Sequence, residues 1–154
     1  MSPVRIALLG IGLLALFPAG CAVNRMQLER DVRELLAGCG VEPASLRASM
    51  GSRTRTGITT FPVTAAEVAA VASGLGLEEI PADAGDGDVT DWLADGTSQY
   101  DHPLLDRPAG VRIYRSDRRP DSLRLAGGSS FEYALLFWDE ANGEALLQLS
   151  YAYG

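Results

Sequence analysis

Five aspartates lie in a glycine-rich stretch of the sequence, where side chains of this type could hold a hard cation. They are Asp83, Asp86, Asp88, Asp91 and Asp95. Calcium binds several carboxylate and carbonyl oxygens at once, and an EF-hand loop needs Gly at its sixth position and Glu at its twelfth. Counted from Asp86, those positions hold Asp91 and Thr97, so the motif fails. The sequence therefore favours a solvated acidic loop in which Asp88 caps a short helix, and we assign no metal site and no cofactor.

The single histidine, His102, follows Asp101, and a histidine next to a carboxylate can serve as a general base. A hydrolase would also need a nucleophile. The sequence has no Gly-x-Ser-x-Gly motif, and Ser129-Ser130 follows two glycines, as expected of a turn. One histidine cannot build a multi-histidine zinc site, and Cys39 is isolated from it in the sequence. We therefore expect His102 to be a loop residue and assign no catalytic residue.

Five arginines in the last third of the chain could bind a carboxylate or a phosphate, because a guanidinium donates two parallel hydrogen bonds to either group. They are Arg112, Arg115, Arg118, Arg119 and Arg124. Alternation along a strand would place Arg112 and Tyr114 on the same face. Cross-strand charge pairing favours a simpler role, in which these arginines lie on an outward face. Their expected partners are then Asp117, Asp121 and Glu132.

Aromatic and aliphatic residues alternate along the segment 131–138. One face is predicted to carry Phe131, Tyr133, Leu135 and Phe137. The other face is predicted to carry Glu132, Ala134, Leu136 and Trp138. Because both faces hold apolar groups, the segment is either a central strand buried on both sides or a strand with one face open to a partner. The sequence leaves these two alternatives open.

Two helices are predicted to position these groups. Apolar residues recur at helical spacing over about 25–37, and Gly38 or Gly40 is expected to end this helix. Asn24 precedes the helix as its expected N-cap.

The second helix begins at Thr64 and Glu67, which have the spacing of a capping box. Gly74 or Gly76 is expected to end it.

The remaining elements are predicted from β-branched runs and turn residues. Residues 40–56 are expected to be mostly loop with one turn of helix at 43–49, and 56–61 to be a short strand. Residues 78–109 are expected to be irregular, apart from a short helix near Trp92.

The last third of the chain is predicted to form β-strands. Its runs are 111–114, 123–125, 131–138 and 145–153, with Asn142-Gly143 in the last turn. Strands joined by short turns form an antiparallel meander, and the helices are available to cover one face. We therefore predict an α+β fold: a four- to five-stranded antiparallel meander sheet packed by two helices.

The N-terminal segment has the layout of a secretory signal. Arg5 supplies a positive charge, and residues 6–17 form an apolar and glycine run shorter than the roughly 20 residues that a membrane-spanning helix needs. The run ends in Phe17-Pro18-Ala19-Gly20-Cys21, which resembles the lipobox of bacterial lipoproteins. Pro18 stands where that family usually has an aliphatic residue. The alternative is a plain secretory signal that leaves Cys21 in the mature chain.

The resemblance implies that the thiol of Cys21 receives a diacylglyceryl group, that residues 1–20 are cleaved and that the new amine is often acylated too. Residues 21–24 would then be the lipidated N-terminus, and residues 25–154 a single α+β domain. In a host with two membranes, Ala22 favours the outer membrane with the domain facing the periplasm, because inner-membrane retention usually goes with Asp there. Cys39 would remain as a lone thiol, which we expect to be buried near a helix end.

The chain is acidic, with 13 arginines, no lysine and 20 acidic residues, a net charge of −7. Without residues 1–20, 12 arginines remain against 20 acidic residues, which gives −8. Negative charge disfavours nucleic acid and anionic headgroups, so the membrane is expected to hold the domain through the lipid anchor. The expected function is non-catalytic binding of an envelope protein partner or component by a lipoprotein. A small periplasmic hydrolase and a purely structural lipoprotein are the alternatives.

Overall fold

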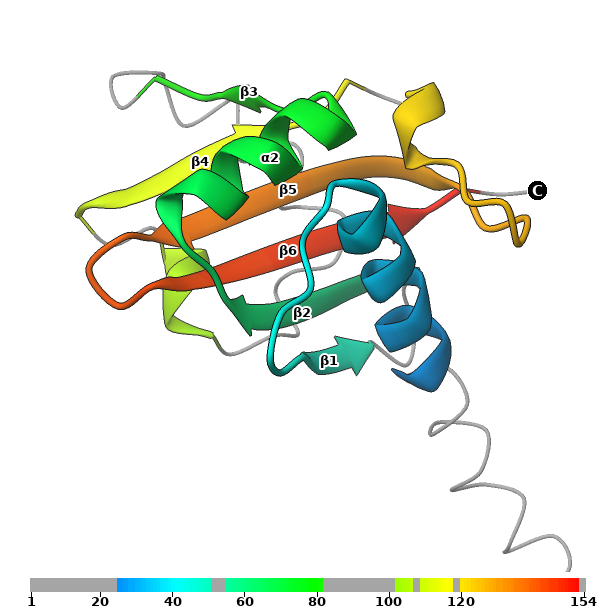
Figure 1. The fold of residues 1–154 in the computed structure, drawn as a ribbon, viewed down its shortest axis with the longest axis horizontal. Helices are drawn as coiled ribbons and strands as arrows, with labels where there is room; N and C mark the ends of the chain where they lie inside the picture. Colours follow the sequence, from blue (N-terminus) through cyan, green and yellow to red (C-terminus); the bar gives the residue numbers. More distant parts are fainter. Residues whose placement is uncertain (1–24, 51–54, 82–101, 107–108, 118–119, 153–154) are drawn as a thin grey trace, which may run out of the picture.

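The computed structural model describes residues 25–50, 55–81, 102–106, 109–117 and 120–152. In this part of the chain, two helices pack on one face of a six-stranded antiparallel sheet (Figure 1), which confirms the α+β class. The N-terminal helix spans residues 25–38, and the second helix is α2 (Ala65–Leu75). The strands are β1 (Arg47–Met50), β2 (Thr56–Pro62), β3 (Glu78–Glu79), β4 (Val111–Arg115), β5 (Phe131–Asp139) and β6 (Glu144–Tyr151). Two 3-10 turns complete the list, η2 (Pro103–Asp106) and η3 (Asp121–Leu123).

The strand order is β1-β2-β6-β5-β4-β3, and every neighbouring pair is antiparallel. Strands β3 to β6 form an antiparallel meander, which includes β3 in place of the strand predicted at 123–125. Strand β6 also has a second neighbour, because β2 of the β1–β2 hairpin pairs with its other side. Helix α2 connects β2 to β3 and so carries the chain across the sheet to its opposite edge (Figure 1). The sheet therefore has six strands rather than the four or five predicted.

The extra strands lie where the sequence predicts loop. Residues 47–50 form β1 instead of the end of a helical turn, and β3 begins the stretch expected to be irregular. The run at 123–125 is not a strand, because Leu123 ends η3 and only an isolated bridge joins Arg124 to Ser130. Strands β1 and β3 are short edge strands held by a longer neighbour, so local propensity does not reveal them. The helix expected near Trp92 lies outside the described residues.

Both helices end at one of the glycines expected to end them. Gly40 has a φ of 75°, and the Val41 N–H donates to the Leu36 carbonyl at 2.9 Å, which closes the N-terminal helix. Gly76 has a φ of 64° and closes α2 in the same way. Both positions require the left-handed backbone conformation that glycine adopts without strain.

Helix α2 begins at the predicted capping box. The Glu67 N–H donates to Thr64 Oγ1 at 3.3 Å, and the Thr64 N–H donates to Glu67 Oε2 at 2.8 Å. The bonds that the Thr64 N–H and hydroxyl donate to Glu67 Oε2 lower the pKa of the Glu67 carboxyl. The motif is local in sequence, so the start of this helix could be predicted to the residue.

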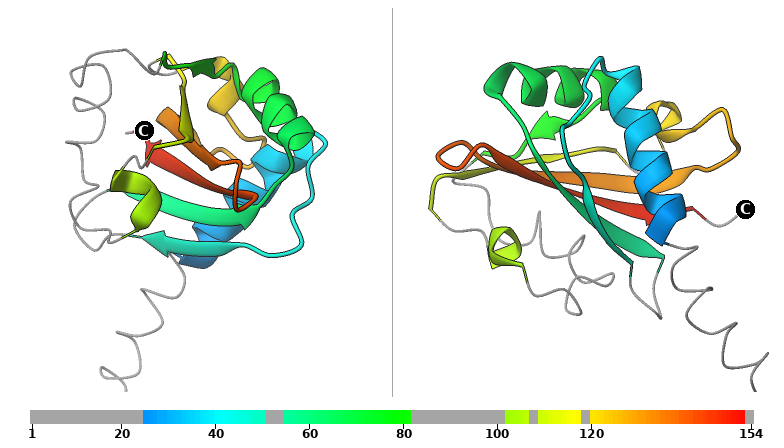
Figure 2. Two further views of the ribbon diagram at one scale, coloured as in Figure 1. Left: turned by 90° about the vertical axis from the view of Figure 1, so that its left-hand side faces the viewer. Right: turned by 60° about the horizontal axis from the view of Figure 1, so that its bottom comes forward.

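The sheet is buried on both faces, with the helices on one side and η2 on the other (Figure 2). The core beneath the helices includes Leu28, Val32, Leu36, Val68, Val71, Leu75, Leu136, Trp138, Leu147 and Leu149. The core on the other face, called the second face below, consists of Ile58, Leu104, Tyr133, Leu135, Phe137 and Leu146. Strand β5 is therefore a central strand buried on both sides, which decides between the two alternatives for its aromatic residues.

One residue of β5 departs from the predicted alternation. The register with β6 shifts between Phe131 and Tyr133, as in a β-bulge. The shift turns Phe131 to the helix side, where it joins the core with Ala134, while Tyr133 lies on the second face. A bulge adds one residue to a strand and so reverses the facing of every residue before it.

The two helices meet at a close contact between Gly74 of α2 and Cys39. A Cβ atom on Gly74 would lie 2.5 Å from Cys39 Sγ and 3.2 Å from Cys39 Cβ. Cys39 lies after the end of the N-terminal helix, as expected, but it is half-buried rather than buried. This partial burial raises the pKa of its thiol. The close packing against Cys39, rather than the backbone conformation, therefore requires glycine at position 74.

We predict that Gly74→Ala destabilises the fold, because the clash with Cys39 costs about 1–3 kcal/mol, more than the ~1 kcal/mol gained in helix propensity. Gly38→Ala, with no atom within 4 Å of the added Cβ, should be neutral or stabilising. Urea unfolding measures both. Adding Cys39→Ala to Gly74→Ala should recover most of the loss, and an equal loss in the two backgrounds would show that Cys39 is not the cause.

Candidate functional site

Several residues singled out in the sequence lie outside the described part of the chain. They are Cys21, Asp83, Asp86, Asp88, Asp91, Asp95, Asp101, Arg118 and Arg119. The lipidation site and the acidic loop therefore remain predictions from sequence.

Within the described residues, no three His, Cys, Asp or Glu side chains come together as a metal-binding group. No helix in those residues has both the length and the apolar character needed to cross a membrane.

His102 directly precedes η2, which packs on the second face of the sheet. Its Nδ1 accepts a hydrogen bond from the Leu104 N–H at 3.2 Å, and Leu104 is buried in the second-face core. Ser129 lies on the other side of the sheet, where Gln27 of the N-terminal helix donates to its hydroxyl at 3.5 Å. The structure therefore separates the histidine from this serine, and one imidazole nitrogen is already used in shaping the turn.

Arg112 and Tyr114 share the helix-side face of β4, as predicted. Arg112 donates two hydrogen bonds to Glu79 of β3, at 2.7 Å from Nε and 2.6 Å from Nη2. Its guanidinium also lies 5.4 Å from the ring centre of Trp138 and 5.7 Å from that of Tyr114, within cation–π range. The bond to Arg112 lowers the pKa of the Glu79 carboxyl, and the bond to Glu79 raises the pKa of Arg112. The sequence could indicate a carboxylate partner for Arg112 but not this one, because β3 was not predicted.

The described arginines of the group do not form one anion-binding patch. Arg115 alternates with Arg112 along β4 and so lies on the opposite face of the sheet. Arg124 lies 3.5 Å from Asp121, one of the partners expected from the sequence. Charge pairing within the fold therefore describes Arg112 and Arg124 better than ligand binding.

A buried carboxylate, which the sequence did not single out, joins the N-terminal helix to β6. Asp31 is 2% exposed, and it accepts hydrogen bonds from Gln27 Nε2 at 2.8 Å and from the Tyr151 hydroxyl at 2.9 Å. The sequence could have indicated that Asp31 is buried, because it lies three residues after Leu28 and four before Leu35, on the apolar side of the helix. Both carboxylate oxygens are occupied, so this group holds the fold together and is not free for chemistry.

A polar hollow of about 280 Å³ opens where β1, β2 and the β5–β6 turn converge. It is lined by Ser45, Arg47, Thr60, Phe61, Pro62, Asn142, Gly143 and Glu144. Backbone pairing brings these distant segments together, with Arg47 opposite Thr60 and Pro62 opposite Glu144. The lining offers a guanidinium, a carboxylate, an amide and two hydroxyls, which suits a polar ligand.

The hollow is held rigidly at its turn. The side chain of Asn142 donates to Asp139 Oδ2 at 2.5 Å, and Gly143 adopts a φ of 61°. The Gly143 carbonyl accepts a hydrogen bond from the Val63 N–H at 2.9 Å, which ties the turn to the end of β2. The turn therefore holds its share of the lining in place before any ligand arrives.

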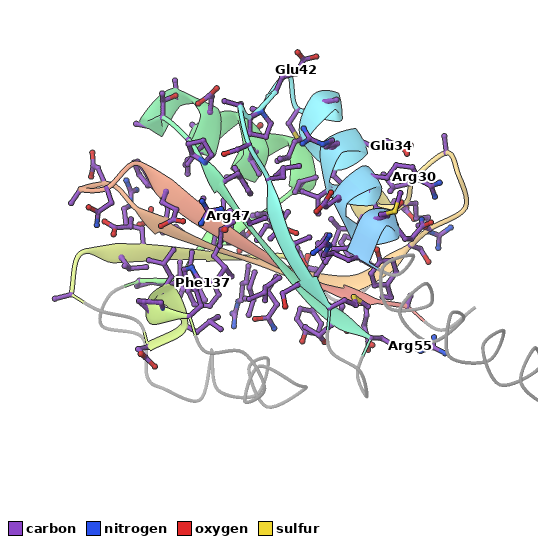
Figure 3. All side chains as sticks on the ribbon, turned by 90° about the horizontal axis from the view of Figure 1, so that it is seen from below. Arg30, Glu34, Glu42, Arg47, Arg55 and Phe137 are labelled. Carbon is purple, nitrogen blue, oxygen red and sulfur yellow. The ribbon has the colours of Figure 1, made fainter. Side chains whose placement is uncertain are left out.

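Of the side chains that line the hollow, Arg47 is the one best suited to bind a ligand. It is exposed, and no described residue forms a hydrogen bond or an ion pair with it. Figure 3 shows it beside the β1–β2 hairpin, well separated from Arg30 and Arg55. Sequence reasoning missed this site because its residues come from segments up to about a hundred positions apart, and because β1 was not predicted.

We predict that Tyr151→Phe lowers the free energy of unfolding at pH 8 by about 1–3 kcal/mol, because it leaves a buried oxygen of Asp31 without its donor. Burial and the bond to Asp31 raise the pKa of the Tyr151 hydroxyl above its ordinary value of about 10. The folded state then holds this proton more tightly than the unfolded state, so stability is retained below pH ~10 and falls as the pH rises further.

Urea unfolding at pH 8 and at pH 10.5 measures both effects. The alkaline loss should be smaller in Tyr151→Phe than in the wild type, although some remains because the pKa of Tyr114 is also raised. An unchanged alkaline loss would mean that Tyr151 is not its source.

No protein-family model, no curated protein and no solved structure matches this chain. Its function is therefore inferred from the residues and their geometry alone.

Proposed function

We propose that this chain is a lipid-anchored envelope protein whose single domain binds a protein partner or envelope component and carries out no catalysis. The anchor is Cys21, and the domain faces the periplasm from the outer membrane in a host with two membranes. Support for the anchor comes from the lipobox-like ending of the N-terminal segment. Residue 25 already belongs to the N-terminal helix and follows Cys21 by four positions, so the lipid would hold the domain close to the bilayer.

One observation carries the binding function: the polar hollow next to β1, in which Arg47 has no partner among the described residues. An unpaired guanidinium in a preformed hollow is suited to recognise an anionic group. The sequence left open an aromatic binding surface on the segment 131–138, but the described aromatic residues of the sheet are buried or half-buried. Binding through the hollow therefore replaces binding through the aromatic face of β5.

The anchor is tested by fractionating cells that express Cys21→Ala, with Cys39→Ala as the matched control. We expect wild type and Cys39→Ala in the membrane fraction, both labelled metabolically by an alkyne fatty acid. Cys21→Ala should be unlabelled and released, because several acyl chains on one residue provide the stable attachment. Membrane retention of unlabelled Cys21→Ala would show that something other than the lipid holds the protein.

The binding role is tested by placing a photoreactive residue in the hollow, Ser45→p-benzoylphenylalanine, in cells. The control is Ala69→p-benzoylphenylalanine on the exposed side of α2. We expect a discrete cross-linked species from position 45 that is absent from position 69, and that weakens when Arg47→Gln is added. The same pattern of products from both positions, or none from either, would contradict a partner at the hollow.

A further inference from the structure

The two edges of the sheet differ in their protection against a further strand. Strand β3 at one edge is two residues long, and both are glutamates, Glu78 and Glu79. Strand β1 at the other edge has four residues, one charge and no proline. Charges, prolines and very short length are the devices that keep an edge from pairing with another chain. Strand β1 is therefore the less protected edge.

The polar hollow lies at the beginning of this same edge strand. Arg47 is the first residue of β1, and Ser45 precedes it by two residues. The rest of the hollow's lining comes from β2 and the β5–β6 turn, on the inner side of β1. A peptide that pairs with the outer side of β1 would therefore reach the rim of the hollow at the exposed side chain of Arg47. Strand addition supplies main-chain hydrogen bonds of low sequence specificity, and a neighbouring pocket supplies the selectivity.

Strand direction decides which end of the peptide reaches the hollow. Every strand pair in the sheet is antiparallel, and antiparallel pairing is slightly more stable per residue than parallel pairing. In antiparallel addition the carboxyl end of the incoming strand lies at the amino end of β1. The residue found there is Arg47, whose planar guanidinium can donate two hydrogen bonds to a carboxylate.

We propose that β1 is the docking edge for the extended C-terminal segment of a partner protein, which pairs antiparallel with β1 and places its terminal carboxylate on Arg47. This inference rests on the proposed binding function and specifies its site and the kind of partner. The free carboxylate and the unmodified peptide backbone are both required.

The test uses the full-length chain in detergent and a library of random heptapeptides that end in a free carboxylate. The best binder from selection is synthesised as the free acid, as the C-terminal amide and with alternate backbone nitrogens methylated. We expect saturable binding of the free acid, and about tenfold weaker binding of the amide because a charge-assisted hydrogen bond pair is lost. Binding of the methylated peptide should be lost, because methylation removes the donors of a β-ladder.

Arg47→Gln should weaken the free acid about tenfold and leave the amide nearly unchanged. Arg33→Gln is the matched control, because Arg33 is also exposed and lacks a partner among the described residues, but belongs to the N-terminal helix. Neither substitution removes a described contact, so circular dichroism melting should show both variants folded. Equal losses in the two variants would reflect general charge and overturn the assignment of Arg47.

The other outcomes separate this inference from the proposed function. Failure to enrich any peptide, or equal affinity of acid and amide, overturns the docking of a C-terminus even if Ser45→p-benzoylphenylalanine captures a partner in cells. Binding that survives backbone methylation overturns strand addition. Absence of both a peptide and a cross-linked partner removes the binding function as well.

Discussion

Strand β6 pairs with β5 on one side and with β2 on the other, and through these two ladders it joins the β1–β2 hairpin to the β3–β5 part of the meander. Without β6 the hairpin would have no neighbour in the sheet, and its apolar residues would lose their place between the two cores. The hydroxyl of Tyr151 in β6 also binds Asp31, which fixes the N-terminal helix. The last strand of the described chain therefore connects the hairpin, the rest of the meander and the first helix.

The same pairing creates the polar hollow. Because Pro62 of β2 lies opposite Glu144 of β6, the end of the hairpin is placed against the β5–β6 turn. The register is set by burial, since a shift of one residue would exchange the buried Leu146 and Leu147 between the two cores. The hollow is thus a consequence of core packing, and its lining can be polar because it lies at the rim of the sheet rather than beneath a helix.

Elements encoded locally could be predicted from the sequence, and elements held by tertiary contacts could not. The start of α2 depends on Thr64 and Glu67, three residues apart, and the end of each helix depends on one glycine. Strand β1 instead depends on its pairing with β2, which no pattern within residues 47–50 indicates. The side taken by Phe131 depends on a bulge that local alternation does not reveal.

Local sequence patterns could not predict the candidate site for the same reason. The pattern around 112–124 correctly indicated that arginines would find carboxylates, but only the folded sheet places Glu79 beside Arg112. The same sheet leaves Arg47 exposed and without a partner among the described residues, so its guanidinium is available to a ligand. The contrast between Arg112, which is paired with a carboxylate, and Arg47, which is not, separates a stabilising role from one suited to recognition. Which arginine finds a carboxylate is decided by the tertiary structure.

The hollow and the start of the N-terminal helix lie at opposite ends of the β1–β2 hairpin. Leu28, near the start of the N-terminal helix, packs against Gly57, and Gly57 lies opposite Met50 at the end of β1. The hollow lies at the other end of the hairpin, by Pro62, roughly 17 Å away at about 3.4 Å per residue. A peptide antiparallel to β1 would place its C-terminus beside Arg47, at the rim of the hollow, and its preceding residues beside Met50, toward the start of the N-terminal helix.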